Sequence, residues 1–322
     1  LDRSSAASDV YKRQTDMRAL DVTMRQLEFT QVKVLGFVMT FDDSGETGAK
    51  RERYGSKYGY KYSYRYDYGY YAAAEKRRRE EDRRKNSSKT SPAHILPNVD
   101  DGSSSLDESL ALLRMLASQG VTLTAATPHF YATSDTPEQF FRRREAAWKQ
   151  LSGAMESSMP CVLLGAEVAF YRNISQMQQL ERFCIGSSRL LLLEMPFEPW
   201  SERVLAETLE ISERGIQVML AHVERYFRFQ RTDMWQRLSD RGIYMQTNAN
   251  ALLRMASAGK TLRMLRCGMI QFLASDCHNL KMRPPRMQEA ARKLSKHFGD
   301  DFTADFFRRE EQLLWEGCAW YA

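Results

Sequence analysis

From residue 91 to the end of the chain, strand-like and helix-like segments alternate, and this alternation limits the possible folds more than any other feature. The expected strands are Val121 to Ala126, Cys161 to Val168, Leu190 to Leu193, Gln217 to Ala221, Ile243 to Gln246 and Ile270 to Ala274. The stretches between them carry helical patterns, such as those at Leu106 to Ser118, Pro137 to Leu151, Ser201 to Arg214 and Arg286 to Phe298. Because strand-then-helix units recur without hairpin signals, we expect a parallel sheet. About seven units in about 230 residues favour an α/β fold with a closed or distorted barrel over an open sheet.

The first 90 residues differ from this body in charge. Of the 47 Lys+Arg and 41 Asp+Glu of the chain, 20 and 14 lie in residues 1–90, so residues 91–322 carry no net charge. The basic excess therefore belongs to a tail and not to the body, and we expect no nucleic-acid partner.

Three segments precede the barrel. Residues 1–14 show no periodicity and resemble a non-native scar more than native protein. Residues 15–50 offer one helical pattern and one strand-like apolar run at 32–39, both without partners. Nine of the 15 tyrosines fall between Arg51 and Tyr71, interleaved with Gly, Lys, Arg and Ser. With so few aliphatic residues, the segment 51–90 is expected to be a disordered linker.

The cysteines and the hydropathy pattern indicate the compartment. Five cysteines are an odd number, and they lie far apart without C-x-x-C spacing, so no disulfide framework or thiolate zinc site is expected. The sequence has no apolar run of 18 or more residues and no signal-peptide pattern at its start. We therefore expect a cytoplasmic protein without a membrane span.

Imidazole and carboxylate side chains stand at or just after the ends of the expected strands. They are His94, His129, Glu167, Glu194, His222, Asp276 and His278. A lone histidine is more often structural, and an acidic residue after a strand is often a helix N-cap. The recurrence of these residues in phase with the repeating unit, however, places them on one face of the barrel and indicates a metal site. Mixed ligands of this kind suit Mn²⁺, Zn²⁺ or Fe, and bridging carboxylates suit a multi-metal centre for phosphoester hydrolysis.

Two arginines lie close to these residues in the sequence. Arg225 follows His222 by three residues, and Arg283 follows His278 by five. Because a planar guanidinium grips phosphate oxygens bidentately, we expect both arginines to hold the phosphate of a substrate.

Seven motifs follow one another along this part of the chain: HILPNVDDG (94–102), ATPH (126–129), GAE (165–167), LEMPF (193–197), AHVERY (221–226), ASDCHN (274–279) and RPP (283–285). Together they resemble the capsule-biosynthesis tyrosine phosphatases of the polymerase-and-histidinol-phosphatase (PHP) superfamily, from about residue 91 almost to the end. The resemblance implies a PHP phosphatase domain at 91–322 with a distorted (β/α)7 barrel. It also implies up to three divalent metals, usually Mn²⁺, and hydrolysis of phosphotyrosine on a partner tyrosine autokinase in capsular or exopolysaccharide biosynthesis.

The resemblance also implies roles for single residues. The metal ligands would be His94, Asp101, His129, Glu167, Glu194, His222, Asp276 and His278, and the catalytic residues would be Arg225, Arg283 and Asp276. The family opens with Asp-x-His-x-His, and aligning its second His with His94 puts Pro92 at the first His and Thr90 at the Asp. Since a proline cannot ligate a metal, one metal site is expected to be weakened and the activity of this chain reduced.

A second resemblance concerns the region before the barrel. Residues 32–71, a strand-like run followed by the tyrosine-rich block, resemble the C-terminal end of a bacterial tyrosine autokinase without its ATP-binding loop. A tail of this kind favours a protein substrate. Two other functions stay open: a catalytically impaired adaptor that binds phosphotyrosine through the two arginines, and another PHP-type phosphoesterase acting on small molecules or nucleic acid.

Overall fold

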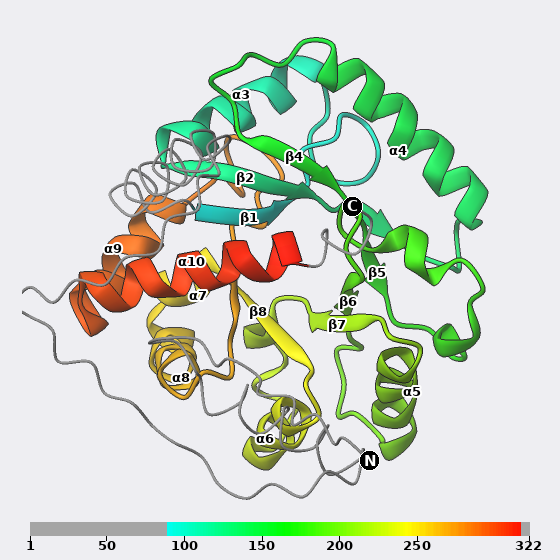
Figure 1. Ribbon diagram of the computed structural model, residues 1–322, viewed down its shortest axis with the longest axis vertical. Coiled ribbons are helices and arrows are strands. Elements are labelled where there is room, and N and C mark those ends of the chain that lie inside the picture. Colours follow the sequence, from blue (N-terminus) through cyan, green and yellow to red (C-terminus); the bar gives the residue numbers. More distant parts are fainter. Residues whose placement is uncertain (1–88, 317–322) are drawn as a thin grey trace, which may run out of the picture. The chain divides into compact units, whose positions relative to one another are not determined.

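The computed structural model describes residues 89–316 (Figure 1). The expected scar, the autokinase-like fragment and nearly all of the expected linker lie outside the described residues. The strands are β1 (Lys89–Ala93), β2 (Val121–Ala126), β3 (His129–Phe130), β4 (Cys161–Leu164), β5 (Glu167–Ala169), β6 (Leu190–Glu194), β7 (Gln217–Leu220), β8 (Tyr244–Asn248) and β9 (Phe272–Ala274). The α-helices are α3 (Leu106–Ser118), α4 (Pro137–Ser152), α5 (Glu202–Glu213), α6 (Thr232–Asp240), α7 (Ala249–Leu253), α8 (Met255–Arg266), α9 (Met287–Phe298) and α10 (Asp300–Glu316). Short 3₁₀ helices are η1 (Ile174–Gln176), η2 (Leu180–Phe183) and η3 (Val223–Tyr226).

The strands pair in parallel in two groups, β1-β2-β4 and β3-β5-β6-β7-β8-β9. β2 and β3 are two halves of one strand path, and so are β4 and β5. The pairing continues across both breaks, because Gly165 N donates to Ala126 O at 2.9 Å and Glu167 N donates to Pro128 O at 3.0 Å. The nine short strands among the described residues therefore follow seven paths, which agrees with the distorted (β/α)7 barrel.

The last strand path returns to the first. Just beyond β9, Asp276 N donates to Pro92 O of β1 at 3.1 Å, and His94 N donates to Cys277 O at 3.0 Å. These two bonds close the ring of strands at the end where β1 and β9 finish. The prediction of an α/β barrel is confirmed.

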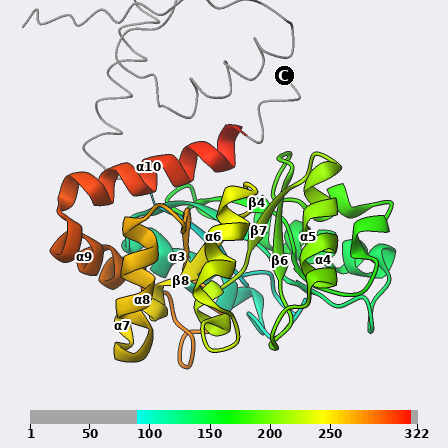
Figure 2. The same ribbon diagram turned by 90° about the horizontal axis from the view of Figure 1, so that it is seen from below.

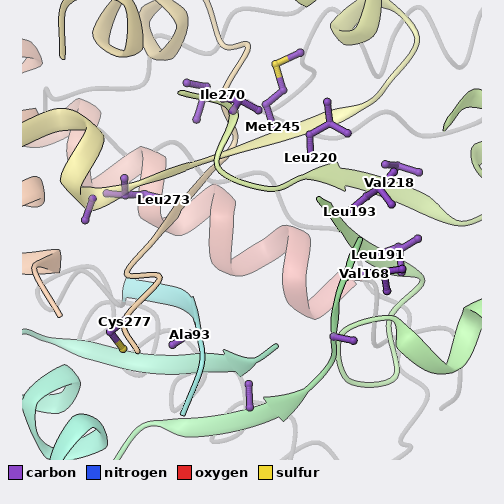
Figure 3. Packing of buried hydrophobic residues seen from close by; sticks show 14 of the residues in the cluster. Ala93, Val168, Leu191, Leu193, Val218, Leu220, Met245, Ile270, Leu273 and Cys277 are labelled. Atoms are coloured by element: carbon purple, nitrogen blue, oxygen red, sulfur yellow. The ribbon is translucent and has the colours of Figure 1, made fainter. Parts of the chain in front are cut away.

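Apart from β4, which is partly exposed, the strands are mostly buried on both faces, as is usual for parallel strands covered on both sides. In β6, Leu190 and Leu192 belong to a buried cluster drawn mainly from other strands, which fills the barrel interior. Leu191 and Leu193 point the other way, into the larger cluster shared with the helices, and Figure 3 shows them near Val168 of β5. This alternation follows from the two-residue period of a strand.

Helix starts are fixed by local capping. The Ser105 side chain accepts a hydrogen bond from Glu108 N at the start of α3, and Thr136 and Gln139 form a capping box at the start of α4. Helix α3 has the predicted bounds, whereas the predicted strand at 161–168 is broken into β4 and β5. Helices α6, α7, α8 and α10 were given no bounds from the sequence. Within residues 89–316, no helix combines the length and apolar character needed to cross a membrane.

Helix α10 packs against the N-terminal half of β1 and along one side of the strands (Figure 2). Its Leu314 belongs to the cluster inside the barrel, and Glu310 Oε1 accepts a hydrogen bond from Leu273 N at 3.1 Å. Glu310 is fully buried. Burial raises the pKa of Glu310 well above its usual value, although the Thr90 hydroxyl and the Leu273 N–H act in the opposite direction. The folded chain therefore favours a neutral carboxyl at this position.

This buried carboxyl predicts a pH-dependent loss of stability. Because the folded chain holds the proton of Glu310 more tightly than the unfolded chain, the free energy of unfolding should fall as pH rises above the ordinary glutamate pKa. The expected slope is about 1.4 kcal/mol per pH unit until the folded pKa is reached. Glu310→Gln keeps the acceptor for Leu273 N and removes the titration, so the variant should gain stability over the unmodified chain as pH rises.

Urea unfolding between about pH 5 and about pH 9 measures this difference. Glu311, the next residue of α10, is only partly buried, and Glu311→Gln is the matched control. A constant difference between Glu310→Gln and the unmodified chain across the pH range would contradict the prediction.

Candidate metal centre

The eight predicted ligands lie together at the C-terminal ends of the strands. They are His94 and Asp101 after β1, His129 in β3, Glu167 in β5, Glu194 at the end of β6, His222 after β7, and Asp276 and His278 after β9. Within the described residues, candidate ligand atoms come within 4.8 Å of one another in three groups: His94, Asp101, His129 and His278; His94, Glu167 and Asp276; and His129, Glu167 and Glu194. His94, His129 and Glu167 each belong to two groups, so the groups adjoin as neighbouring metal sites would.

The ring of His94 is held by Asp100, a residue that the sequence analysis did not select. His94 Nδ1 lies 2.6 Å from Asp100 Oδ2, which also accepts a hydrogen bond from His129 N at 2.9 Å. Burial raises the pKa of Asp100, but His94 and the backbone donors outweigh it and hold this pKa well below its usual value. With Nδ1 committed to a carboxylate, His94 Nε2 faces Glu167 Oε2 at 3.5 Å and Asp276 Oδ1 at 3.6 Å. Such a partner fixes the tautomer of a metal-binding imidazole.

Gly102 is required by this loop. Its N–H donates to Asp100 Oδ1 at 3.0 Å, and a Cβ at this position would lie 2.4 Å from His94 O. Any other residue would push the backbone away from His94. The Asp-Asp-Gly sequence after β1 thus supplies a positioning carboxylate, a candidate ligand and a close backbone contact in three consecutive residues.

Glu167 faces two histidines of the cluster, His129 and His222, with one carboxylate oxygen. Its Oε1 is 3.0 Å from His222 Nε2 and 3.8 Å from His129 Nδ1, and His222 Nε2 is also 3.2 Å from Glu194 Oε1. Burial lowers the pKa of His222, but Glu167 and Glu194 outweigh this effect and raise it to about 9. Burial raises the pKa of Glu167, but His222 and His94 hold it well below its usual value.

This donor set fits divalent cations. The separations of 3.0 to 3.8 Å between facing imidazole and carboxylate atoms approach the roughly 3.0–3.4 Å between neighbouring ligands about 2.1 Å from one ion. The buried ring nitrogens His129 Nδ1, His222 Nδ1 and His278 Nε2 have no hydrogen-bond partner among residues 89–316. Burial and the neighbouring His94 lower the pKa of His278 to about 4, which keeps this ring in the neutral, ligating form. A cation would replace the proton that His222 otherwise takes up between two carboxylates.

Asp276 joins the cluster to both predicted arginines. Its Oδ2 accepts hydrogen bonds from Arg225 Nη2 at 2.8 Å, from Arg283 Nη2 at 2.6 Å and from Asn248 Nδ2. Its other oxygen, Oδ1, faces His94. The two guanidinium groups therefore converge beside the candidate ligands, and about a third of each side chain is exposed.

Several residues that support the candidate ligands and arginines were not predicted from the sequence. Asn279 Oδ1 accepts hydrogen bonds from the N–H groups of residues 281, 282 and 283, and this turn positions Arg283. Gln246 Oε1 accepts a hydrogen bond from His222 N at 2.7 Å, and Gln246 Nε2 donates to Asn248 Oδ1 at 2.8 Å. β8, the strand without a predicted ligand, thus ends in amides that hold His222 and Asp276. Polar residues in an otherwise buried strand are the signal that could have revealed them.

Two of the candidate ligands have unusual backbone geometry. His222 has φ 34° and Asp276 has φ 50°, in the left-handed region that residues other than glycine rarely adopt. Both residues come just after strands, β7 and β9. Strain of this kind clusters at functional sites, where the surrounding contacts maintain it.

Pro92 is the residue that we align with the first histidine of the family pattern. It lies in β1, buried, opposite Ala125 of β2 and two residues before His94. Its carbonyl accepts the bond from Asp276 N, so position 92 adjoins the candidate metal centre. The expected weakening of one metal site stays a prediction.

Comparison with known proteins shows which family this barrel matches. The family described as "Capsular polysaccharide synthesis, CpsB/CapC" matches residues 92–315. Tyrosine-protein phosphatase YwqE of Bacillus subtilis is 27% identical over 229 residues, covering 69% of this chain and 89% of that protein. Tyrosine-protein phosphatase CpsB of Streptococcus pneumoniae is 27% identical over 228 residues, covering 67% and 93%. A putative tyrosine-protein phosphatase CapC of Staphylococcus aureus is 29% identical over 217 residues, covering 64% and 83%.

A solved structure agrees with this match. It comes from work on YwqE from Bacillus subtilis and CpsB from Streptococcus pneumoniae, described as unique metal-dependent tyrosine phosphatases. Its TM-score is 0.62 at 25% sequence identity, and the alignment covers 70% of this chain and 94% of that chain. The family match spans more than two thirds of the chain and includes every candidate ligand. The chain therefore belongs to the CpsB/CapC family of capsular polysaccharide synthesis.

Proposed function

We propose that this chain is a metal-dependent protein-tyrosine phosphatase of capsular or exopolysaccharide biosynthesis. The proposal rests on one observation: eight imidazole and carboxylate side chains lie together, and one of them, Asp276, binds two arginines. The relatives named tyrosine-protein phosphatases, and the solved relative described as metal-dependent, support it.

The three groups of candidate ligands would hold up to three divalent ions. Imidazole and carboxylate donors suit Mn²⁺, and Zn²⁺ or Fe are compatible with the same donors. When bound, such ions supply Lewis acidity that stabilises charge on phosphoryl oxygens and makes water nucleophilic near neutral pH.

The chain's own residues bind and orient the substrate. Arg225 and Arg283 each use Nη2 on Asp276, and their other N–H groups would hold the phosphoryl oxygens. Asp276 keeps the two guanidinium groups together, and Asp100 keeps the His94 ring in one orientation. In the reaction a P–O bond to the oxygen of water forms, the P–O bond to the phenolic oxygen of the substrate breaks, and the phenolic oxygen takes up a proton of that water. The positive charge of the arginines stabilises the charge that develops on the phosphoryl group.

The proposed partner is a bacterial tyrosine autokinase phosphorylated on a tyrosine-rich tail. The tyrosine-rich block at 51–71 of this chain, which resembles such a tail, and the membership of the capsule-synthesis family support this partner. The absence of net charge in residues 91–322 argues against nucleic acid. We place the activity in the cytoplasm, and the free thiols of Cys161, Cys184, Cys267 and Cys277 are consistent with a reducing compartment.

Metal content and turnover test the proposal. The full-length chain is loaded with Mn²⁺ and given a phosphotyrosine peptide, with the phosphoserine peptide of the same sequence as control. We expect release of phosphate from the phosphotyrosine peptide, loss of turnover with a chelator, and recovery when Mn²⁺ returns. Binding of the peptide without turnover would indicate the adaptor instead. Hydrolysis restricted to small-molecule esters or nucleic acid would indicate another phosphoesterase.

A further inference from the structure

Exposed apolar side chains gather around the candidate metal centre. The large hydrophobic residues that are exposed within residues 89–314 are Tyr131, Phe197, Met255, Leu280 and Met282. All except Met255 follow a strand end that carries a candidate ligand: Tyr131 comes two residues after His129, and Phe197 comes three residues after Glu194. Apolar surface is therefore concentrated at the open end of the barrel, where it contributes nothing to the buried core.

The two aromatic rings stand directly on candidate ligands. Tyr131 stacks on His129 with ring centroids 5.3 Å apart and an interplanar angle of 25°. Phe197 stacks on His222 with centroids 6.1 Å apart and an angle of 16°. His129 and His222 both face the same oxygen of Glu167. The rings of Tyr131 and Phe197 therefore stack on two imidazoles that contact one carboxylate.

Neither ring contributes to the buried hydrophobic core. Tyr131 is 42% exposed and Phe197 is 48% exposed, and neither belongs to a buried hydrophobic cluster. Phe197 is nevertheless fixed in place, because it contacts the fully buried Tyr226 at a centroid distance of 5.2 Å. Large, positioned and half-exposed aromatic rings are typical of surfaces that bind another apolar group.

We propose that Tyr131 and Phe197 receive the aromatic ring of an aryl phosphate and make the site prefer aryl over alkyl phosphates. The proposal rests on the function proposed above. A phosphate monoester held by Arg225 and Arg283 has one organic substituent. This substituent must extend away from the candidate metal centre through the open end of the barrel, where the two rings lie. A phenyl substituent is rigid and stacks on such rings, whereas the single methylene of a phosphoserine side chain does not.

Aromatic contacts of this kind are worth about 3- to 10-fold in binding for each ring. We therefore expect Tyr131→Ala with Phe197→Ala to lower kcat/KM for phenyl phosphate by about 10-fold or more, and to leave kcat/KM for ethyl phosphate nearly unchanged. Tyr131→Phe should keep the preference, because the ring and not the hydroxyl is required. Met255→Ala is the control, since Met255 is exposed at the start of α8 and the strand before it, β8, carries no candidate ligand.

Binding of unreactive phosphonates separates this proposal from the phosphatase activity itself. With the full-length, Mn²⁺-loaded chain, phenylphosphonate should bind more tightly than methylphosphonate, and the double alanine variant should lose the difference. If the chain shows this preference but hydrolyses neither ester, the proposed function fails and the aryl site stands. If the double variant weakens phenyl and alkyl ligands equally, or weakens neither, the aryl site is overturned whatever the activity.

Discussion

His222→Ala is expected to lose bound metal and phosphatase activity together. The substitution removes the imidazole nitrogen that lies 3.0 Å from Glu167 Oε1 and 3.2 Å from Glu194 Oε1, beside the group formed by His129, Glu167 and Glu194. Loss of a direct ligand should cost far more than the roughly 10- to 100-fold typical of residues that only support a ligand. Elemental analysis of the purified chain and turnover of a phosphotyrosine peptide measure the two effects.

The control for this prediction is His297→Ala. His297 is the histidine of the chain that stands apart from the cluster, exposed on α9, and its loss should leave metal content and turnover unchanged. A His222→Ala chain that keeps its full metal content would remove His222 from the ligand set.

A second variant separates ligand loss from a change in backbone strain. Because His222 has φ 34°, an alanine there carries a steric penalty, whereas asparagine tolerates the left-handed region better. His222→Asn should therefore lose metal and activity as His222→Ala does, while its thermal unfolding midpoint stays closer to that of the metal-free unmodified chain. Equal loss of stability with retained metal would show that His222 acts only through the fold.

The barrel could be predicted because each unit repeats the same physical requirement. A strand buried on both faces must be apolar along its whole length, as Leu190 to Leu193 are, and the helix that follows must cover it. The candidate ligands could be predicted for a related reason, because a polar group directly after such a strand stands out from the pattern. Glu194 and His222 are examples.

The breaks within strands could not be predicted. The run from Cys161 to Val168 reads as one strand, but it is interrupted at Gly165 and Ala166 and divides into β4 and β5. Gly165 is closely packed at this break, since a Cβ there would lie 3.0 Å from Ile185 and 3.3 Å from Thr127. These neighbours are distant in the sequence, and no local pattern announces them.

Supporting residues of the site were missed for a similar reason. Asp100 and Asp101 are adjacent carboxylates, and only the folded loop shows that Asp100 holds His94 while Asp101 faces His129 and His278. Asn248 carries neither charge nor imidazole, so its polar side chain at the end of a buried strand is a weak signal, and its contact with Asp276 is seen only in the fold. Sequence patterns identify groups that bind strongly by themselves, but hydrogen-bonded support depends on the geometry of the fold.

Pro92 is the position at which we expect the chain to depart from the family pattern, and its place in β1 indicates what such a departure would remove. Alternate residues of a strand share a face, so a side chain at 92 lies on the same face as His94. The carbonyl of Pro92 accepts a hydrogen bond from Asp276 N at 3.1 Å, which brings this face of β1 to the candidate ligands. Proline supplies no ligand there, and it also lacks the N–H that an interior strand uses for pairing.

Restoring the imidazole should therefore restore a metal site. Pro92→His is expected to raise bound Mn²⁺ per chain and to raise turnover of a phosphotyrosine peptide at saturating Mn²⁺ by at least about 10-fold, equivalent to about 1.4 kcal/mol in the barrier. Thr90 should be left unchanged, because it is buried where its hydroxyl acts on Glu310, and an aspartate there would bring a second carboxyl to that residue.

Pro92→Ala is the matched control, since it returns the backbone N–H without an imidazole. If the deficit is a missing ligand, Pro92→His should exceed Pro92→Ala in both metal content and turnover, and Pro92→Ala should gain stability at most. Equal gains in the two variants would show that the proline harms the strand and not the metal site. An unmodified chain that already binds three metals, and is not improved by Pro92→His, would show that position 92 does not correspond to the first histidine of the family pattern.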